Sequence, residues 1–319
     1  MLYMDDYIIR KVSKKKRDRV IHKYYNKKGD PISDKKYIKK SICGIYIPPA
    51  YKDVKINLNK DAKILAIGLD DKGRSQYVYN KKYTKSQSDK KFDSMIDFGK
   101  HFKKINKKIN EDLYSVKDSK EKQIAIILKL IMECNFRIGN DVYSKNNKSY
   151  GTTTLQQEHI KIKNKDQIRI EFNGKKNIRN SCIIKDKKLV KTFKQKKRTL
   201  RKKDRIFTYR KGGRYYNIKS SDVNRYLKVF GNFTAKDFRT WGANIELIKQ
   251  LKKKNSQLNI CIDKVALKLH NTPAVCKSNY LDPEIIQFYK YDPENFKKYF
   301  NFKTDNSLYN QYVYFLEDL

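Results

Sequence analysis

Hydrophobic and polar residues follow different patterns in the first and in the later parts of the chain. Up to about residue 86, short apolar runs such as 63–69 and 75–79 flank turn signals such as the segment 70–73. Runs of this length, bounded by Asp, Lys and Gly, are typical of strands joined by hairpins. The pattern predicts a small β-rich N-terminal domain over residues 1–86, with the polar residues 84–91 as a linker.

Helical spacing dominates after this region. Apolar residues at positions 124, 127, 128 and 131 recur at i, i+3, i+4 and i+7, so they share one face of a helix that we expect to end at Gly139. The same spacing returns at positions 262, 265, 266 and 269. We therefore expect residues 87–319 to form a larger, mainly α-helical domain.

A short β segment interrupts the helical pattern. Apolar residues at 168, 170 and 172 alternate with polar ones, and Asn173-Gly174 follows as a tight-turn signal. This arrangement predicts a hairpin with Lys175 at its tip. The fold class is accordingly α+β: a small β-rich N-terminal domain and a larger helical domain that contains a small β-sheet.

The charge of the chain indicates its partner. The 319 residues include 75 Lys and Arg against 34 Asp and Glu, a formal net charge of +41, while hydrophobic residues at 39% suffice for a core. Such an excess of one sign destabilises a compact protein unless a polyanion neutralises it, and DNA or RNA is the simplest polyanion. A compositional bias toward Lys, Asn and Ile explains lysine in place of arginine, but it does not explain the small number of acidic residues.

Several other classes of protein are disfavoured. No apolar run approaches the roughly 20 residues that span a bilayer, and the N-terminus lacks the charge order of a signal peptide. The five cysteines form no CxxC pair, and the four histidines are not spaced as metal ligands. We expect reduced thiols in a soluble, intracellular protein that has no metal site, no cofactor and no membrane association.

The last third of the chain carries the candidate chemistry. Arg239 lies in a basic segment, and Tyr280 follows a turn that begins at Pro273. Metal-free cleavage of a phosphodiester needs a nucleophile, cations for the non-bridging oxygens and an acid for the leaving oxygen. A tyrosine, whose ordinary pKa is near 10, needs cationic help to attack at neutral pH. A phosphotyrosyl bond keeps the energy of the cleaved bond, so the strand can be resealed without ATP.

Eight segments together resemble a known family. They are residues 47–54, 73–79, 137–140, 149–155, 172–175, 222–227 and the pair 233–241 with 271–280. In this order they resemble the poxvirus, giant-virus and bacterial branch of the type IB DNA topoisomerases, over about residues 17–290. The resemblance implies relaxation of supercoiled DNA by nicking one strand, letting it rotate and resealing it, without ATP or metal.

The resemblance assigns roles to individual residues. Tyr280 would be the nucleophile that leaves a 3′-phosphotyrosyl strand, and Arg137 and Arg239 would hold the non-bridging oxygens, where the planar guanidinium is superior to lysine. Lys175, together with Arg137, would protonate the departing 5′ oxygen. Asn271 stands where the poxvirus enzymes have a histidine, and its amide could donate to a phosphate oxygen without titrating.

Further residues would contact DNA. Gln76, Tyr77 and Tyr79 fall where the small domain of the family faces the major groove, and Arg74 and Lys236 belong to the same DNA-binding set. His270, one position before Asn271, is expected to be structural because one residue turns a helix by roughly 100°. The basic run 194–205 would touch the DNA backbone.

The expected assembly is a monomer whose two domains close as a C-shaped clamp around double-stranded DNA. The expected location is viral, in the virion or at a replication site in the host cell, or otherwise the bacterial cytoplasm or nucleoid. Two other functions stay open at this point. A tyrosine site-specific recombinase uses the same Arg, Lys, Arg and Tyr chemistry but needs four synapsed protomers, and a basic DNA-packaging protein needs no chemistry.

Overall fold

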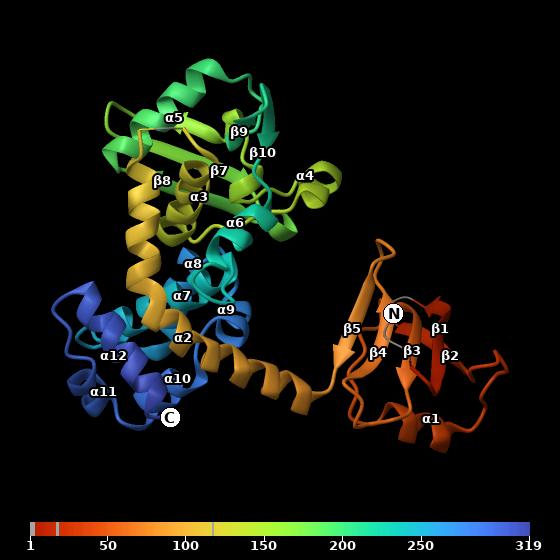
Figure 1. The fold of residues 1–319 in the computed structure, drawn as a ribbon. Helices are drawn as coiled ribbons and strands as arrows, with labels where there is room; N and C mark the ends of the chain where they lie inside the picture. Colours follow the sequence, from red (N-terminus) through yellow and green to blue (C-terminus); the bar gives the residue numbers. More distant parts are fainter. Residues whose placement is uncertain (1–3, 17–18, 117) are drawn as a thin grey trace. The chain divides into compact units, whose positions relative to one another are not determined.

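A computed structural model describes residues 4–16, 19–116 and 118–319 of the chain (Figure 1). The contacts divide it into two compact units, Met1–Lys91 and Phe92–Leu319. The first unit is built around a sheet and the second is mainly helical with two small sheets, so the α+β expectation is confirmed. Among the described residues, no helix is both long and apolar enough to cross a membrane.

The N-terminal unit is a five-stranded antiparallel sheet in the order β2-β1-β3-β4-β5. Its elements are β1 (Tyr7–Lys16), β2 (Arg19–Tyr25), α1 (Lys35–Ile42), β3 (Lys52–Asn57), β4 (Ile64–Leu69) and β5 (Ser75–Tyr79). Its buried core consists of Ile8, Ile47, Val54, Ile56 and Ala66. The predicted hairpin over 70–73 is confirmed: the Gly73 N–H donates to the Asp70 carbonyl at 2.9 Å, and Gly73 has a φ of +70° that favours glycine.

Residues 84–91, predicted to be a linker, belong to the helix α2 (Lys81–Tyr114), 34 residues long, and the first compact unit ends at Lys91. The segment is polar, but it contains neither glycine nor proline, and nothing in it stops a helix. From Phe92 onward α2 buries one face, which includes Met95, Phe98 and Ile105. The boundary between the two compact units, and the one expected after residue 86, both fall within this helix.

The larger unit contains most of the helices. They are α3 (Lys120–Cys134), α4 (Asp141–Asn147), α5 (Lys187–Thr199), α6 (Ser220–Leu227), α7 (Ala235–Leu251), α8 (Leu258–Lys268), α9 (Pro273–Asn279), α10 (Pro283–Tyr291), α11 (Pro293–Tyr299) and α12 (Asp305–Glu317). In Figure 1, α10, α11 and α12 group at the C-terminus, and α5 lies with β7 and β8. The spacing at 124–131 forms α3, but the helix ends earlier than Gly139, at the left-handed C-cap Asn135 with φ 52°.

Two small sheets complete this unit. The three-stranded sheet has the order β6-β7-β8 and consists of β6 (Ile160–Ile162), β7 (Ile168–Asn173) and β8 (Arg179–Ile184); β9 (Thr208–Lys211) pairs with β10 (Arg214–Asn217). The alternating residues 168, 170 and 172 are buried on β7, as expected. Lys175 does lie in the β7–β8 hairpin loop, but Asn173 and Gly174 do not make a two-residue turn. Asn173 pairs with Arg179, Gly174 has φ −94°, and the left-handed positions are Lys176 and Asn177.

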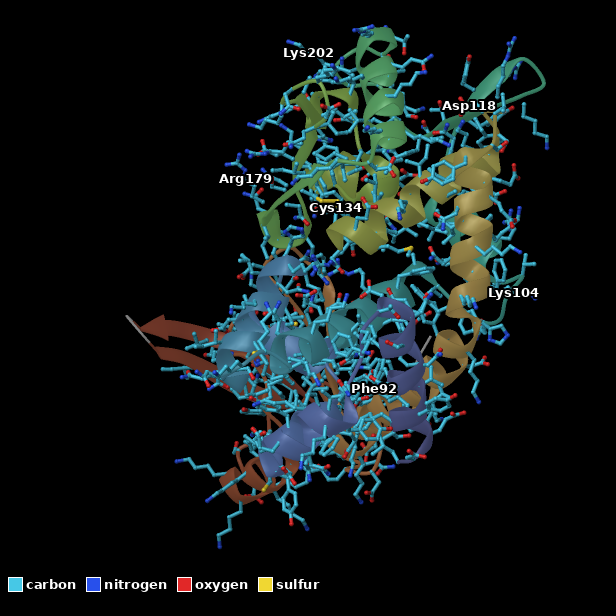
Figure 2. The ribbon with its side chains drawn as sticks, turned by 90° about the vertical axis from the view of Figure 1, so that its left-hand side faces the viewer. Phe92, Lys104, Asp118, Cys134, Arg179 and Lys202 are labelled. Carbon is cyan, nitrogen blue, oxygen red and sulfur yellow. A yellow bond between two sulfur atoms is a disulfide. The ribbon has the colours of Figure 1, made fainter. Side chains whose placement is uncertain are left out.

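The expectation that all cysteines are reduced thiols is also wrong. Cys134, the last residue of α3, forms a disulfide with Cys182 on β8, with the two Cα atoms 5.6 Å apart (Figure 2). The two residues are 48 positions apart and belong to no short motif, so their pairing depends on the packing of α3 against the sheet. Cys43, Cys261 and Cys276 are free.

Candidate active site

Tyr280 directly follows the short helix α9. Pro273 begins this helix, and the Thr272 side chain caps it. The backbone of Tyr280 is held at both ends: its N–H donates to the Cys276 carbonyl at 2.9 Å, and its carbonyl accepts from the Asn244 amide at 3.0 Å. The side chain is only 8% exposed.

Asn244 on α7 is a positioning residue that the sequence did not single out. It is fully buried, donates to the Thr240 and Tyr280 carbonyls and accepts from the Asp282 N–H at 2.8 Å. These bonds fasten the segment after α9 to α7, the helix that carries Arg239. A polar residue among the apolar positions of a buried helix is the only signal in the sequence that could have identified it.

Arg239 is buried beside Tyr280. Its side chain is 3% exposed, and its Cζ atom lies 5.1 Å from the centroid of the Tyr280 ring. Nη2 donates to the Leu269 carbonyl at 3.1 Å, whereas Nε and Nη1 are buried with no hydrogen-bond partner among the described residues. Burial lowers the pKa of this guanidinium. Unpaired buried donors are costly, so two of them on one cation indicate a site for an anion.

Arg137 and Asn271 are 134 positions apart in the sequence but in contact in the structure. Arg137 Nη2 donates a hydrogen bond to Asn271 Oδ1. The Nδ2 atom of Asn271 is buried and has no partner among the described residues, so its donor is available to another acceptor. Arg137 does not cap α3, since Asn135 does so. The predicted residues Arg137, Arg239, Asn271 and Tyr280 are thus brought together.

The backbone of Arg137 is held by the short helix η1 (Thr152–Thr154). The Thr152 N–H donates to the Arg137 carbonyl at 2.8 Å, and the Thr153 N–H donates to the Ile138 carbonyl at 2.7 Å. This packing requires glycine at position 151, because a Cβ there would lie 2.6 Å from the Arg137 carbonyl oxygen and 2.5 Å from the backbone of Gly139. The close approach explains the glycines of the segments 137–140 and 149–155.

The surroundings of Tyr280 favour its phenolate. Burial by itself raises the pKa of the phenol, but the positive charges of Arg239 and Arg137, a hydrogen bond from Arg239 and the charge of Lys236 outweigh this effect, so the pKa lies below its ordinary value. Lys236 is exposed in the first turn of α7. A phenol buried among cations therefore ionises more readily than an ordinary tyrosine.

Lys175 and His270 are the two remaining residues that the sequence analysis considered at this site. Lys175 is exposed in the hairpin loop η3 (Lys175–Asn177), and it is not among the hydrogen-bond partners found for the four grouped residues. His270 faces the Cys134 carbonyl through Nε2 at 3.2 Å and lies against the Phe136 ring, with centroids 5.6 Å apart. The expectation that His270 is structural agrees with these contacts.

The expected DNA contacts of the N-terminal unit do not share one face. Asp70 binds both Arg74, at 2.6 Å, and Gln76, at 3.0 Å, and its bond to Arg74 lowers the pKa of this carboxyl to about 2. Tyr77 and Tyr79 are exposed, and their rings stack with centroids 6.1 Å apart. Since side chains alternate along β5, the two tyrosines face away from Gln76.

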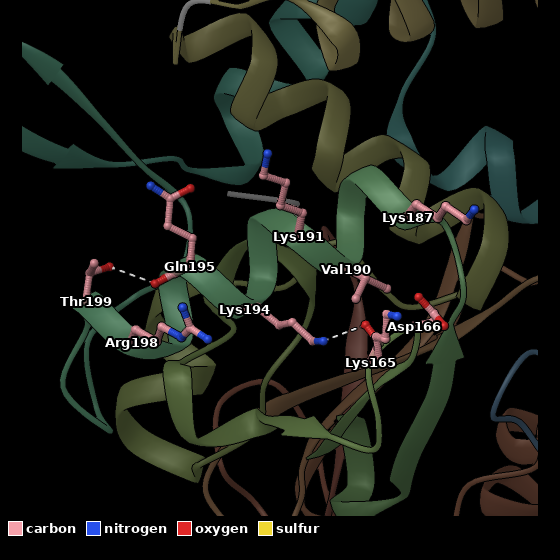
Figure 3. Close-up of a pocket in the computed structure, with 9 residues that line it drawn as sticks. All are labelled: Lys165, Asp166, Lys187, Val190, Lys191, Lys194, Gln195, Arg198 and Thr199. Atoms are coloured by element: carbon pink, nitrogen blue, oxygen red, sulfur yellow. Dashed lines mark hydrogen bonds between the residues drawn. The ribbon is translucent and has the colours of Figure 1, made fainter.

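A basic cavity of about 650 Å³ lies along α5 (Figure 3). Its cationic lining residues are Lys165, Lys187, Lys191, Lys194 and Arg198. The expected basic surface over 194–205 is only partly realised here. Lys196 is turned inward to donate to the Ile206 carbonyl at 2.9 Å, and burial lowers the pKa of its amine. Among the described residues, no group of three or more His, Cys, Asp or Glu side chains could hold a metal ion.

Comparison with known proteins agrees with this geometry. Residues 80–303 match the model of the eukaryotic DNA topoisomerase I catalytic core, and residues 22–70 match the N-terminal domain of bacterial DNA topoisomerase IB. The chain is 30% identical to DNA topoisomerase 1B of Acanthamoeba polyphaga mimivirus over 274 residues, which cover 80% of this chain and 81% of that protein. It is 27% identical to DNA topoisomerase 1B of Vaccinia virus (strain Copenhagen) over 241 residues, 72% of this chain and 73% of that protein.

Proposed function

The chain belongs to the type IB DNA topoisomerases, and from this premise we propose the roles of its residues in their reaction. The enzyme relaxes supercoiled DNA by cleaving one strand through a 3′-phosphotyrosyl intermediate, letting the strand rotate and resealing it, without ATP or metal. In our proposal the phenol oxygen of Tyr280 attacks the phosphorus, and the bond to the 5′ oxygen breaks. The reverse attack by that 5′ hydroxyl reseals the strand and releases the tyrosine.

Arg239, Arg137 and Asn271 would bind the non-bridging oxygens of the scissile phosphate. The observation that carries this proposal is the pair of nitrogens on Arg239 that have no partner among the described residues and lie buried beside the phenol of Tyr280. Asn271 adds a third donor without a partner in the described part of the chain, and Arg137 is already oriented by its bond to Asn271. Donors fixed in place before the reaction stabilise the charge of the transition state without reorganisation.

Lys175 would protonate the leaving 5′ oxygen together with Arg137. Its position in an exposed loop between two paired strands supports this role, because such a loop can reach a groove of DNA while the strands hold it. The proton goes from the ammonium to the 5′ oxygen as the bond to phosphorus breaks, and it returns during religation.

The substrate of the family is DNA. We propose that the form bound here is double-stranded, that the enzyme acts as a monomer, and that its two units close around the duplex. The net charge of +41 and the exposed tyrosines of β5 support binding to a long polyanion. The viral sources of the relatives support a site of action in a virion or at a viral replication site. The alternatives of a recombinase and a packaging protein leave the match of residues 22–70 unexplained.

A plasmid assay with EDTA and without ATP tests the proposal, run beside a denaturing gel that detects covalent adducts. The wild-type protein should relax the plasmid and form an adduct on a 3′ end. Tyr280→Phe should bind DNA and form none. A covalent adduct formed by this variant would remove Tyr280 from its proposed role.

A further inference from the structure

The disulfide between Cys134 and Cys182 joins two parts of the chain that carry proposed catalytic cations (Figure 2). Cys134 ends α3, three residues before Arg137. Cys182 lies on β8, the strand that returns from the hairpin loop of Lys175. The bond is therefore a covalent link between the segment of Arg137 and the hairpin of Lys175.

The disulfide attaches a strand at the edge of its sheet to a helix. β8 is an edge strand: in the order β6-β7-β8 it pairs with β7 alone, and Cys182 lies opposite Ile170. Its ladder with β7 fixes the hairpin internally, and buried residues such as Ile170 and Ile184 pack it into the core of the larger unit. The disulfide adds a covalent attachment, to the end of the buried helix α3.

A third segment of the site, the one that carries Asn271, also contacts Cys134. His270, which precedes Asn271, faces the carbonyl of Cys134 at 3.2 Å through Nε2. The ring of Phe136 packs edge-to-face on Phe172 of β7, with centroids 4.8 Å apart, and also against His270. The segments that carry Arg137, Lys175 and Asn271 thus converge around Cys134.

We propose that the Cys134–Cys182 disulfide is a positioning element of the active site, which holds the Lys175 hairpin in register with Arg137 for protonation of the leaving 5′ oxygen. This inference rests on the proposed role of Lys175. A dithiol reductant would give two electrons and two protons to the bond, forming thiols on both cysteines and its own disulfide. The β7–β8 ladder and the Phe136–Phe172 contact would keep the fold, while the loop of Lys175 would sample more positions.

The test compares two substrates under single-turnover conditions at saturating protein: ordinary duplex DNA, and DNA with a 5′-bridging phosphorothiolate, whose leaving sulfur needs no proton. Wild type before and after dithiothreitol, Cys182→Ser and Lys175→Ala are assayed side by side. Cys43→Ser is the matched control, because Cys43 is exposed and free. Thiol titration reports the state of the bond, and circular dichroism reports folding.

Opening the disulfide should slow cleavage of ordinary DNA by about 10- to 100-fold, the scale expected for a misplaced catalytic group. The phosphorothiolate should restore the rate, DNA affinity should not change, and reoxidation of the reduced wild type should recover activity. Cys43→Ser should behave as wild type. Adding Cys182→Ser to Lys175→Ala should cause no further loss.

Three outcomes would overturn the inference: both cysteines titrating as thiols in the untreated protein, cleavage unaffected by opening the bond, or an equal loss on both substrates. The experiment distinguishes failure of the disulfide's positioning role from failure of the acid role of Lys175. If Lys175→Ala is rescued by the phosphorothiolate but Cys182→Ser is not impaired, only the role of the disulfide is wrong. If Lys175→Ala is not rescued, the acid role of Lys175 is wrong and the inference falls with it.

Discussion

Arg239 and Tyr280 face each other inside the larger unit, with the guanidinium carbon 5.1 Å from the centroid of the phenol ring and each side chain more than nine-tenths buried. A buried cation lowers the pKa of the phenol, and two nitrogens of the same cation have no hydrogen-bond partner among the residues that the structure describes. In the proposed mechanism, one residue therefore both activates the nucleophile and stabilises the charge that the attack creates.

Replacing Arg239 with lysine should impair cleavage much more than binding. Lysine keeps the charge but loses the planar fork, so at least one donor to the phosphate is lost. We expect single-turnover cleavage to fall by about 10²- to 10³-fold, as for removal of one transition-state donor. Many phosphate contacts contribute to DNA affinity, so the affinity measured in a filter-binding assay should change little. Relaxation near the wild-type rate would exclude Arg239 from the site.

The rate of cleavage should depend on pH through Tyr280. Because its pKa is lowered by Arg239, Arg137 and Lys236, removal of Lys236 should raise that pKa. The phenolate then forms at higher pH, so the rise of the cleavage rate with pH should shift upward in Lys236→Ala. Lys254→Ala, another exposed lysine, is the control and should leave the profile in place. Identical profiles for the two variants would contradict the electrostatic account.

Exchanging Asn271 for histidine should create a pH dependence that the wild-type protein lacks at this position. Asparagine donates from Nδ2 at every pH, whereas histidine donates from both ring nitrogens only when protonated, with an ordinary pKa near 6.5. Cleavage by Asn271→His should fall as the pH rises through that region, and the wild type should show no such loss. Asn271→Asp, which keeps the acceptor for Arg137 but repels phosphate, should be slower than either. An unchanged rate in Asn271→Asp would argue against a phosphate contact.

A methyl group at position 151 should displace Arg137. The Cβ of Gly151→Ala would lie 2.5 Å from the Gly139 backbone and 2.6 Å from the Arg137 carbonyl oxygen, too close for either. Overpacking of this kind costs about 1–3 kcal/mol of unfolding free energy. The control is Gly242→Ala inside α7, where the nearest atom lies at 3.5 Å and alanine favours the helix. Urea unfolding should show a loss for Gly151→Ala and none for Gly242→Ala.

Local signals in the sequence sufficed for several features of the site. Pro273 begins the helix that ends just before Tyr280, and the alternation along 168–172 forms the strand that leads to Lys175. The sequence pattern indicated Gly139 only as a helix stop, and the structure alone shows the close approach of its backbone to Gly151, beside Arg137. Local signals did not predict the helical conformation of residues 84–91, where polar residues without a helix breaker form part of α2.

The sequence by itself determined the types of residue, their order and most of the elements that carry them, because backbone propensity and capping act within a few residues. Only the tertiary structure decided which atoms meet. Distant segments are joined by the hydrogen bond from Arg137 to Asn271, the hydrogen bond from Asn244 to Tyr280 and the Cys134–Cys182 disulfide. The packing of Arg239 against Tyr280 also brings distant segments together. Such contacts follow from how α3, α7, α8 and the sheet pack together, and no local pattern encodes that packing.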